Sequence, residues 1–252
     1  MQIDLNADLG EGFGPWAMGA DDAMLQLVSS ANIACGGHAS DPETMFTTLG
    51  LAKAQGVMVG AHPGYADPLG FGRRIIPMSI PQIEQMVAAQ IGSLMGVAAL
   101  AGVRMGYVKA HGALANLAAE NRDVADAVVR AVRAVSRDLA YLAISGTCQH
   151  EAGLAAGLQT FAEVFADRAY QPNGRLVPRS HPLAMIHDPV AAAARMLGFV
   201  QTGIMPVLDG PAIPLQAQSV CVHGDSPGAV AMAQHVATAL RGAGIGIKAF
   251  LT

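Results

Sequence analysis

Residues 107–112, Tyr-Val-Lys-Ala-His-Gly, have the pattern of a buried strand that ends in polar chemistry. Side chains alternate between the two faces of a strand, so Tyr107, Lys109 and His111 share one face. Apolar segments on both sides of the stretch predict an interior position. An unpaired ammonium there would cost several kcal/mol in desolvation, so we expect Lys109 to meet a carboxylate, a phosphate or a substrate. From this stretch alone, a structural ion pair and a functional lysine are equally good interpretations.

Short apolar strands followed by polar residues recur along the chain. They are predicted at residues 2–8, 29–35, 57–61, 107–111, 139–145, 160–166 and 219–222, and helical patterns separate most of them. This alternation favours a parallel sheet. The polar residues at or just after the strand ends are Asp8, His38, His62, Lys109, His111, Glu163, Asp167, His223 and Asp225.

In a closed β/α barrel all these strand ends lie on one face, which carries the chemistry. We therefore predict a TIM-like α/β fold: an irregular seven-stranded parallel β/α barrel, or one with an eighth strand that the pattern misses. Residues 1–252 would form a single domain. An open doubly wound sheet is the rival, but it concentrates its polar residues at one switch point.

Local signals refine this prediction. Asp4, Asn6 and Asp8 share one face of the first strand, which indicates either a solvent edge or a polar barrel lumen. An Ala-rich pattern predicts one helix over about residues 114–135. Ser226-Pro227 has the pattern of a cap for the last helix. Small hairpins are expected near residues 173–174 and within 204–215.

Composition excludes several classes of function. Charged residues make up only 13% of the chain and the net charge is -4, so we expect uncharged surface that contacts partner subunits or other copies of the chain. The chain has no basic cluster for nucleic acid and no convincing membrane span. Three cysteines without metal-type spacing and the lack of a leader pattern indicate a reduced cytoplasm.

Three chemistries fit the polar residues. Asp8 with His38, His62 or His223 offers ligands for zinc or a similar divalent ion, although no close histidine spacing supports this. A metal-free amidohydrolase could activate water with histidine or carboxylate and stabilise an oxyanion with Lys109. A phosphoryl-transfer step could place Lys109 and an arginine on phosphates, although the chain has no Walker loop.

Longer motifs carry a specific resemblance. Residues 4–11 (Asp-Leu-Asn-Ala-Asp-Leu-Gly-Glu), 30–38, 60–65, 70–74, 108–114, 163–170 and 221–225 resemble, in order, the LamB/YcsF family, the A subunits of 5-oxoprolinase. The resemblance implies an irregular barrel similar to those of polysaccharide deacetylases. It also implies ATP-dependent opening of 5-oxoproline to L-glutamate, together with subunits B and C. Ala110 and Ala115 stand where the family often has Pro and Tyr.

Site residues follow from the resemblance combined with the strand-end pattern. The catalytic residues would be Asp8, Lys109, His111, Glu163, His223 and Asp225. Substrate or nucleotide would be bound by Asn6, Glu11, Asn32, His38, His62, Arg73, Arg168 and Arg179. ATP with Mg²⁺ would be the co-substrate, and a further divalent metal, if used, would be bound by Asp8, His38 and His62. The rival functions are a metal-dependent deacetylase-like hydrolase that needs no ATP and a non-catalytic binding subunit.

Overall fold

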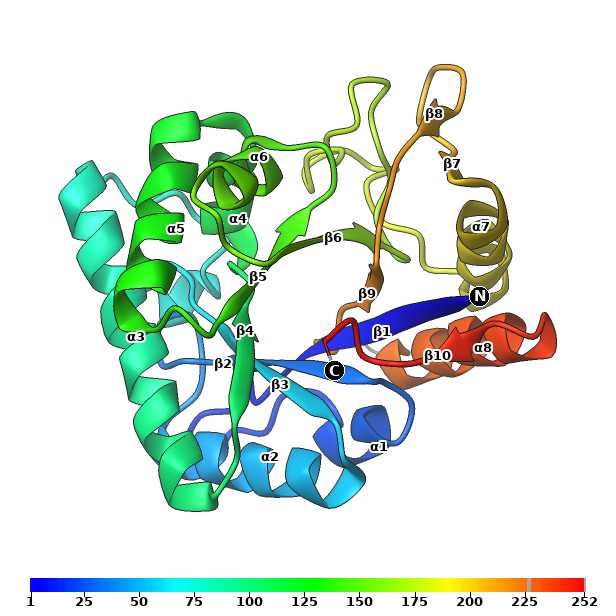
Figure 1. Ribbon diagram of the computed structural model, residues 1–252. Coiled ribbons are helices and arrows are strands. Elements are labelled where there is room, and N and C mark those ends of the chain that lie inside the picture. The colour runs from blue at the N-terminus through cyan, green and yellow to red at the C-terminus, as the bar shows by residue number, and fades with distance from the viewer. Residues whose placement is uncertain (226–227, 252) are drawn as a thin grey trace.

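Seven parallel strands form a closed barrel surrounded by helices. The computed structural model describes residues 1–225 and 228–251. Around the ring the strands are β1 (Gln2–Leu9), β2 (Ser30–Ala34), β3 (Met58–His62), β4 (Met105–Val108), β5 (Ala140–Ile144), β6 (Thr160–Phe165) and β9 (Ser219–Val222). Strand β9 pairs with both β6 and β1, which closes the ring (Figure 1). The predicted barrel is confirmed.

The ring is irregular at two places. β1 pairs with β9 from Asp4 to Ala7, and nearer its start it pairs with the short strand β10 (Gly246–Ile247), an eighth parallel strand on the same sheet. The register between β3 and β4 shifts at Gly60. A Cβ atom at Gly60 would lie 2.3 Å from the Tyr107 ring, so only glycine leaves room for that ring inside the barrel.

Helices cover the outside of the strand ring (Figure 1). Asp41 caps α2 by accepting from Glu43 N and Thr44 N, and the Gln82 side chain accepts from Ser79 N at the start of α3. The α-helices are α1 (Asp21–Leu25), α2 (Pro42–Gln55), α3 (Ile80–Ala101), α4 (Gly112–Glu120), α5 (Arg122–Val135), α6 (Cys148–Ala155), α7 (Pro189–Thr202) and α8 (Ala229–Gly242).

The single helix predicted over residues 114–135 is wrong, because the chain forms α4 and α5 there. Asn121 separates them in an extended conformation, and its side chain accepts from Asp123 N and Val124 N to cap α5. Asparagine competes for backbone donors in this way and so favours a helix start over a helix interior. The predicted Ser226-Pro227 cap lies outside the described residues.

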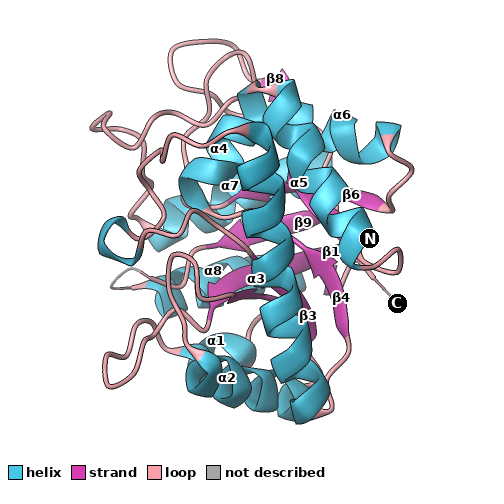
Figure 2. Ribbon diagram, turned by 90° about the vertical axis from the view of Figure 1, so that its left-hand side faces the viewer, coloured by secondary structure: helices cyan, strands magenta, loops and turns pink. Residues whose placement is uncertain are grey.

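Both predicted hairpins are present in short form. Strands β7 (Ile204–Met205) and β8 (Ile213–Pro214) pair antiparallel. Around Gly174, Gln171 N donates to Arg175 O at 2.7 Å, and Tyr170 bridges to Leu176. Figure 2 shows that the long loops gather on one side of the barrel, opposite the two termini. This side holds the C-terminal ends of the strands.

The main core lies between the barrel and its helices. The stripe on α3, Ile83, Val87, Ile91 and Leu94, is buried there as predicted. By length and composition alone α3 could span a membrane, but its apolar stripe packs on this core. A second, small cluster lies within the strand ring, where Tyr107 and Leu142 pack with Phe250 and Leu251.

Candidate functional site

The ammonium group of Lys109, just after β4, lies buried in the mouth of the barrel. Its Nζ is 3.0 Å from Asp8 Oδ1 and 3.1 Å from Glu163 Oε2, and it donates to Cys221 Sγ at 3.0 Å. Burial opposes the positive charge, but Asp8, Cys221 and Glu163 hold the pKa of Lys109 well above its usual range. The expected carboxylate partner is therefore present twice.

The pKa values of the two carboxyl groups beside Lys109 are shifted in opposite directions. Burial alone would raise the pKa of Asp8, but His62 and Lys109 hold the pKa of that carboxyl well below its usual range. Burial raises the pKa of Glu163, and the attraction to Lys109 does not offset this. Asp8 is thus the stable carboxylate of the pair, and Glu163 is the group that takes up a proton first.

Two buried amides hold these groups in place. Asn32 Nδ2 donates to Asp8 Oδ1 at 2.8 Å and to Asn6 Oδ1 at 2.7 Å, while Tyr107 donates to Asn32 Oδ1 at 2.6 Å. Asn6 Nδ2 in turn donates to Glu163 Oε2 at 3.3 Å. The first strand therefore faces a polar lumen and not solvent. We expected Asn6 and Asn32 to bind substrate or nucleotide, but these bonds make them positioning residues for the carboxyl groups.

His223, directly after β9, forms an ordered pair with Asp167. Its Nδ1 lies 2.7 Å from Asp167 Oδ2, and its Nε2 lies 4.0 Å from Asp8 Oδ2. Burial would raise the pKa of Asp167, but His223 and the nearby arginines lower it, so this carboxyl is an ionised acceptor. Asp167 therefore accepts from Nδ1–H of His223 and fixes the ring, so that Nε2 points toward Asp8 and accepts from Arg179 Nη2 at 3.4 Å.

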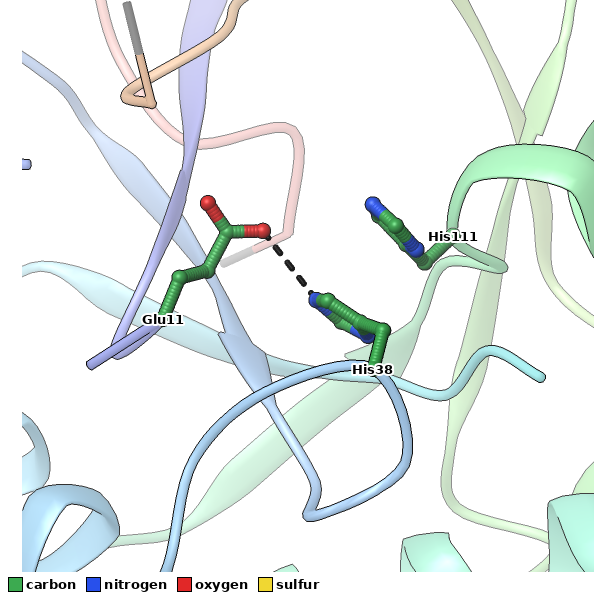
Figure 3. A group of neighbouring side chains, drawn as sticks. All are labelled: Glu11, His38 and His111. Carbon is green, nitrogen blue, oxygen red and sulfur yellow. Dashed lines mark hydrogen bonds and ion pairs between the residues drawn. The ribbon is translucent and has the colours of Figure 1, made fainter. Parts of the chain in front are cut away.

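A separate cluster at the rim joins Glu11, His38 and His111 (Figure 3). His38 Nε2 lies 3.1 Å from Glu11 Oε1, and the rings of His38 and His111 stack 3.6 Å apart with an angle of 12°. Burial lowers the pKa of both histidines and raises that of Glu11. Burial therefore favours the neutral form of each of the three groups.

Two of the metal ligands expected from sequence lie together, because His62 Nε2 is 3.3 Å from Asp8 Oδ1 while His62 Nδ1 faces Lys109 O at 2.8 Å. Asp8 is also paired with Lys109, and the third expected ligand, His38, lies against Glu11. In the described chain, Glu11, His38 and His111 instead place three possible ligand atoms within 4.8 Å of one another. An imidazole binds a metal in its ring plane, and these two planes are nearly parallel. A single ion cannot lie in both planes, so one ring would have to turn before this group fits a metal.

Two adjoining cavities open above Lys109. The smaller, about 30 Å³, holds one water-sized molecule, and its lining includes Asp8, His62, Lys109 and His223. The larger, about 360 Å³, is lined by loops and by the start of α4. Their shared lining includes Arg73, Arg168 and Arg179. A small substrate in the larger cavity can therefore reach a water beside the polar groups.

Every residue predicted for the site lies in or around this mouth. Arg73 Nη2 pairs with Asp225 Oδ2 at 2.6 Å, and Arg179 Nη2 lies 3.4 Å from His223 Nε2. Sequence reasoning placed Asp167 among the strand-end polar residues but gave it no role, and it missed Arg175 and Cys221. Arg175 follows a hairpin turn that carries no strand-end signal.

Comparison with known proteins gives the family. Residues 3–252 match the LamB/YcsF family. The chain belongs to this family. A 5-oxoprolinase A subunit from Rhodopseudomonas palustris (strain BisB18) is 51% identical over 249 residues, with 98% of each chain covered. One from Chloroflexus aggregans (strain MD-66 / DSM 9485) is 48% identical over 248 residues, again with 98% of each covered.

Solved structures agree with the LamB/YcsF assignment. The lactam utilization protein from Thermus thermophilus superimposes with a TM-score of 0.94 at 42% identity, covering 99% of this chain and 100% of that one. A family 4 carbohydrate esterase from Streptomyces lividans matches with a TM-score of 0.50 at 12% identity, covering 98% and 91%. The second likeness concerns the fold alone and confirms the predicted similarity to deacetylase barrels.

Proposed function

We propose that this chain is the A subunit of an ATP-dependent 5-oxoprolinase, which opens the lactam of 5-oxoproline to L-glutamate. LamB/YcsF relatives of about the same length are named as the 5-oxoprolinase A subunit, and a structural neighbour is named a lactam utilization protein. The observation that carries the proposal is the water-sized cavity beside Lys109 and His223, which opens into a cavity large enough for a small cyclic amide.

The chemistry needs activation because a five-membered lactam is a stable amide. Transfer of the terminal phosphoryl group of ATP to the lactam oxygen releases ADP and gives a more electrophilic ring carbon. Water then adds to this carbon, and the carbon–nitrogen bond breaks as the nitrogen takes up a proton. The product is an acyl phosphate, and a second water hydrolyses it to glutamate and inorganic phosphate. Two waters are consumed for each ATP.

His223 is the general base in this proposal. His223 lines the small cavity, where its Nε2 can take a proton from water, and Asp167 holds the ring through Nδ1. Two other candidates are less well placed. Asp225 is paired with Arg73, and Glu163 is held between Lys109 and Asn6.

Lys109 stabilises, through its fixed positive charge, the negative charge that develops on the water-derived oxygen as the tetrahedral adduct collapses and the carbon–nitrogen bond breaks. Its ammonium is already desolvated and fixed by Asp8, so no reorganisation is needed in the transition state. Arg73 and Arg179 reach the shared wall of both cavities and can bind the substrate carboxylate, which would orient the ring carbon toward the water. Loss of this carboxylate from the substrate is expected to weaken binding strongly.

The proposal includes partners and location. The relatives' name denotes one subunit among others, and we propose subunits B and C as the partners, ATP with Mg²⁺ as co-substrate and the cytoplasm as the location. The test is 5-oxoproline-dependent ADP release with glutamate formation, measured with and without the partner subunits. A reconstituted complex that hydrolyses ATP but forms no glutamate from 5-oxoproline would refute the substrate.

A metal-dependent hydrolase is the second candidate, favoured only by the Glu11, His38 and His111 cluster. The parallel rings fit a single ion poorly, and the Lys109 ammonium already neutralises Asp8. Elemental analysis and chelator treatment separate the two functions. The metal-dependent hydrolase would replace the proposal above if each chain held one equivalent of metal tightly and if amide hydrolysis without ATP were lost on chelation.

A further inference from the structure

A loop of eight apolar residues lies exposed beside the mouth of the barrel. Residues 13–20, Phe-Gly-Pro-Trp-Ala-Met-Gly-Ala, come shortly after Glu11 of the rim cluster, and every one of them is exposed. Trp16, the one tryptophan of the chain, is 70% exposed, and Phe13 is 52% exposed. Single apolar residues are ordinary on a protein surface, but a contiguous group that includes a large aromatic ring marks an interaction site.

Hydrogen bonds hold this loop in one shape. Phe13 N donates to Trp16 O at 2.9 Å, and Trp16 N donates to Phe13 O at 3.0 Å. Gly14 N donates to Asp41 Oδ2 at 2.7 Å, which fastens the turn to the start of α2. At the far end of the loop, Gly19 lies close to the backbone of the segment that follows β9. A preformed loop loses little conformational entropy when a partner covers it, so its apolar area is available for binding.

The hollow beside the loop is acidic. It measures about 380 Å³, and its lining combines two apolar side chains of the loop with three carboxylates: Trp16, Met18, Asp21, Asp41 and Glu43. None of its described lining residues is a lysine, an arginine or a histidine. Donors of this chain already bond to Asp21 and Asp41, whereas Glu43 is exposed at the start of α2. The surface therefore fits an apolar segment that carries a lysine or arginine, whose stem packs on the indole ring and whose charge meets Glu43.

Charge decides which occupant this surface takes. A second copy of the chain that docked here by two-fold symmetry would bring the carboxylates of both copies face to face, which is unfavourable. The same carboxylates repel an anionic membrane surface. We propose that residues 13–20 and the acidic hollow form the docking surface for a partner subunit of the 5-oxoprolinase complex, which contacts them with an apolar and basic segment. This inference rests on the proposed function and names the surface through which the proposed partners bind.

The single tryptophan provides the test. The chain is prepared with 5-fluorotryptophan, which places one fluorine in the molecule, and its NMR signal is recorded while purified subunits B and C are added without ATP. We expect the signal to shift because the exposed indole becomes buried. Trp16→Ala should weaken association in calorimetry on the order of thirtyfold or more, because a central tryptophan carries much of the binding energy of an interface. Leu100→Ala is the matched control, since Leu100 is 79% exposed just before β4, at the opposite end of the barrel, and this variant should bind like wild type.

A second variant, Glu43→Gln, tests the charge of the hollow. It should slow association severalfold and reduce its dependence on salt, because charges at the edge of an interface act mainly on the rate of encounter. An unchanged rate would overturn the charge argument that selects the occupant.

Three other results would overturn the docking surface. They are a fluorine signal that ignores subunits B and C, wild-type association by Trp16→Ala, and a signal of the chain alone that shifts on dilution or with vesicles of phosphatidylcholine and phosphatidylglycerol. The last result would assign the surface to a second copy or to a membrane. Glutamate formation by the wild-type complex is scored separately. A complex that forms glutamate while Trp16→Ala associates normally refutes the docking surface alone, and a complex that assembles here but forms no glutamate refutes the proposed function alone.

Discussion

Replacing Lys109 by methionine tests the centre of the site. Its ammonium lies 3.0 Å from Asp8 and 3.1 Å from Glu163, and at an effective dielectric constant of about 20 each contact is worth about 5 kcal/mol of gross attraction. Most of this offsets the desolvation of three buried groups. Because removal of one partner leaves buried carboxyl groups without compensation, we expect a net loss of about 3–5 kcal/mol in unfolding free energy.

The assay combines thermal unfolding with glutamate formation in the complete complex. For a chain of this size the loss corresponds to a fall in Tm of roughly 6–20 °C. Adding Asp8→Asn removes one of the uncompensated charges, so the double variant should regain part of the stability. Activity should not return, because the oxyanion would still lack its ammonium. Turnover as in wild type for Lys109→Met would remove this residue from the mechanism, and unchanged Tm would refute the charge argument.

Three further predictions use single substitutions. Burial raises the pKa of Asp4 from 3.8 to about 6, so the folded chain holds this proton more tightly than the unfolded chain. Stability should therefore decline by about 3 kcal/mol in total as pH rises from well below 3.8 to well above 6, and Asp4→Asn should flatten this part of the urea-unfolding profile. Asp167→Asn should lower kcat on the order of a hundredfold or more with little change in KM, because the imidazole it orients would lose the tautomer needed for proton transfer. Gly60→Ala would press on the Tyr107 ring and cost about 1–3 kcal/mol in chemical denaturation. The control Gly50→Ala, on an exposed turn of α2, should be neutral or stabilising.

The barrel could be predicted from the sequence because the same local pattern, a short apolar strand followed by a polar residue, recurs along the chain. Each strand end carried a polar residue, and this recurrence predicted a common face that the structure confirms. The break at Asn121 was missed because an Ala-rich pattern continues through it. The eighth strand, β10, was missed because a strand of two residues, one of them glycine, is too short to show an alternation of apolar and polar residues.

Site membership was predictable, but roles inside the site were not. Asp8 and Glu163 have similar chemistry in the sequence, and only their surroundings in the fold lower the pKa of Asp8 and raise that of Glu163. For the same reason, binding of a metal by Asp8, His38 and His62 stays a prediction. Which histidine faces which carboxylate depends on loop geometry after three different strands, and residue spacing contains no information on it.

The small cluster inside the strand ring connects Phe250 to the polar groups of the site through a chain of contacts. Phe250 packs against Tyr107 with ring centroids 5.0 Å apart, the Tyr107 hydroxyl bonds to Asn32, and Asn32 bonds to Asp8. Removing Phe250 would take away a packing partner of Tyr107, whose hydroxyl group bonds to Asn32 and so helps to position Asp8. A change near Phe250 would therefore reach Asp8, although the two residues come from opposite halves of the sequence.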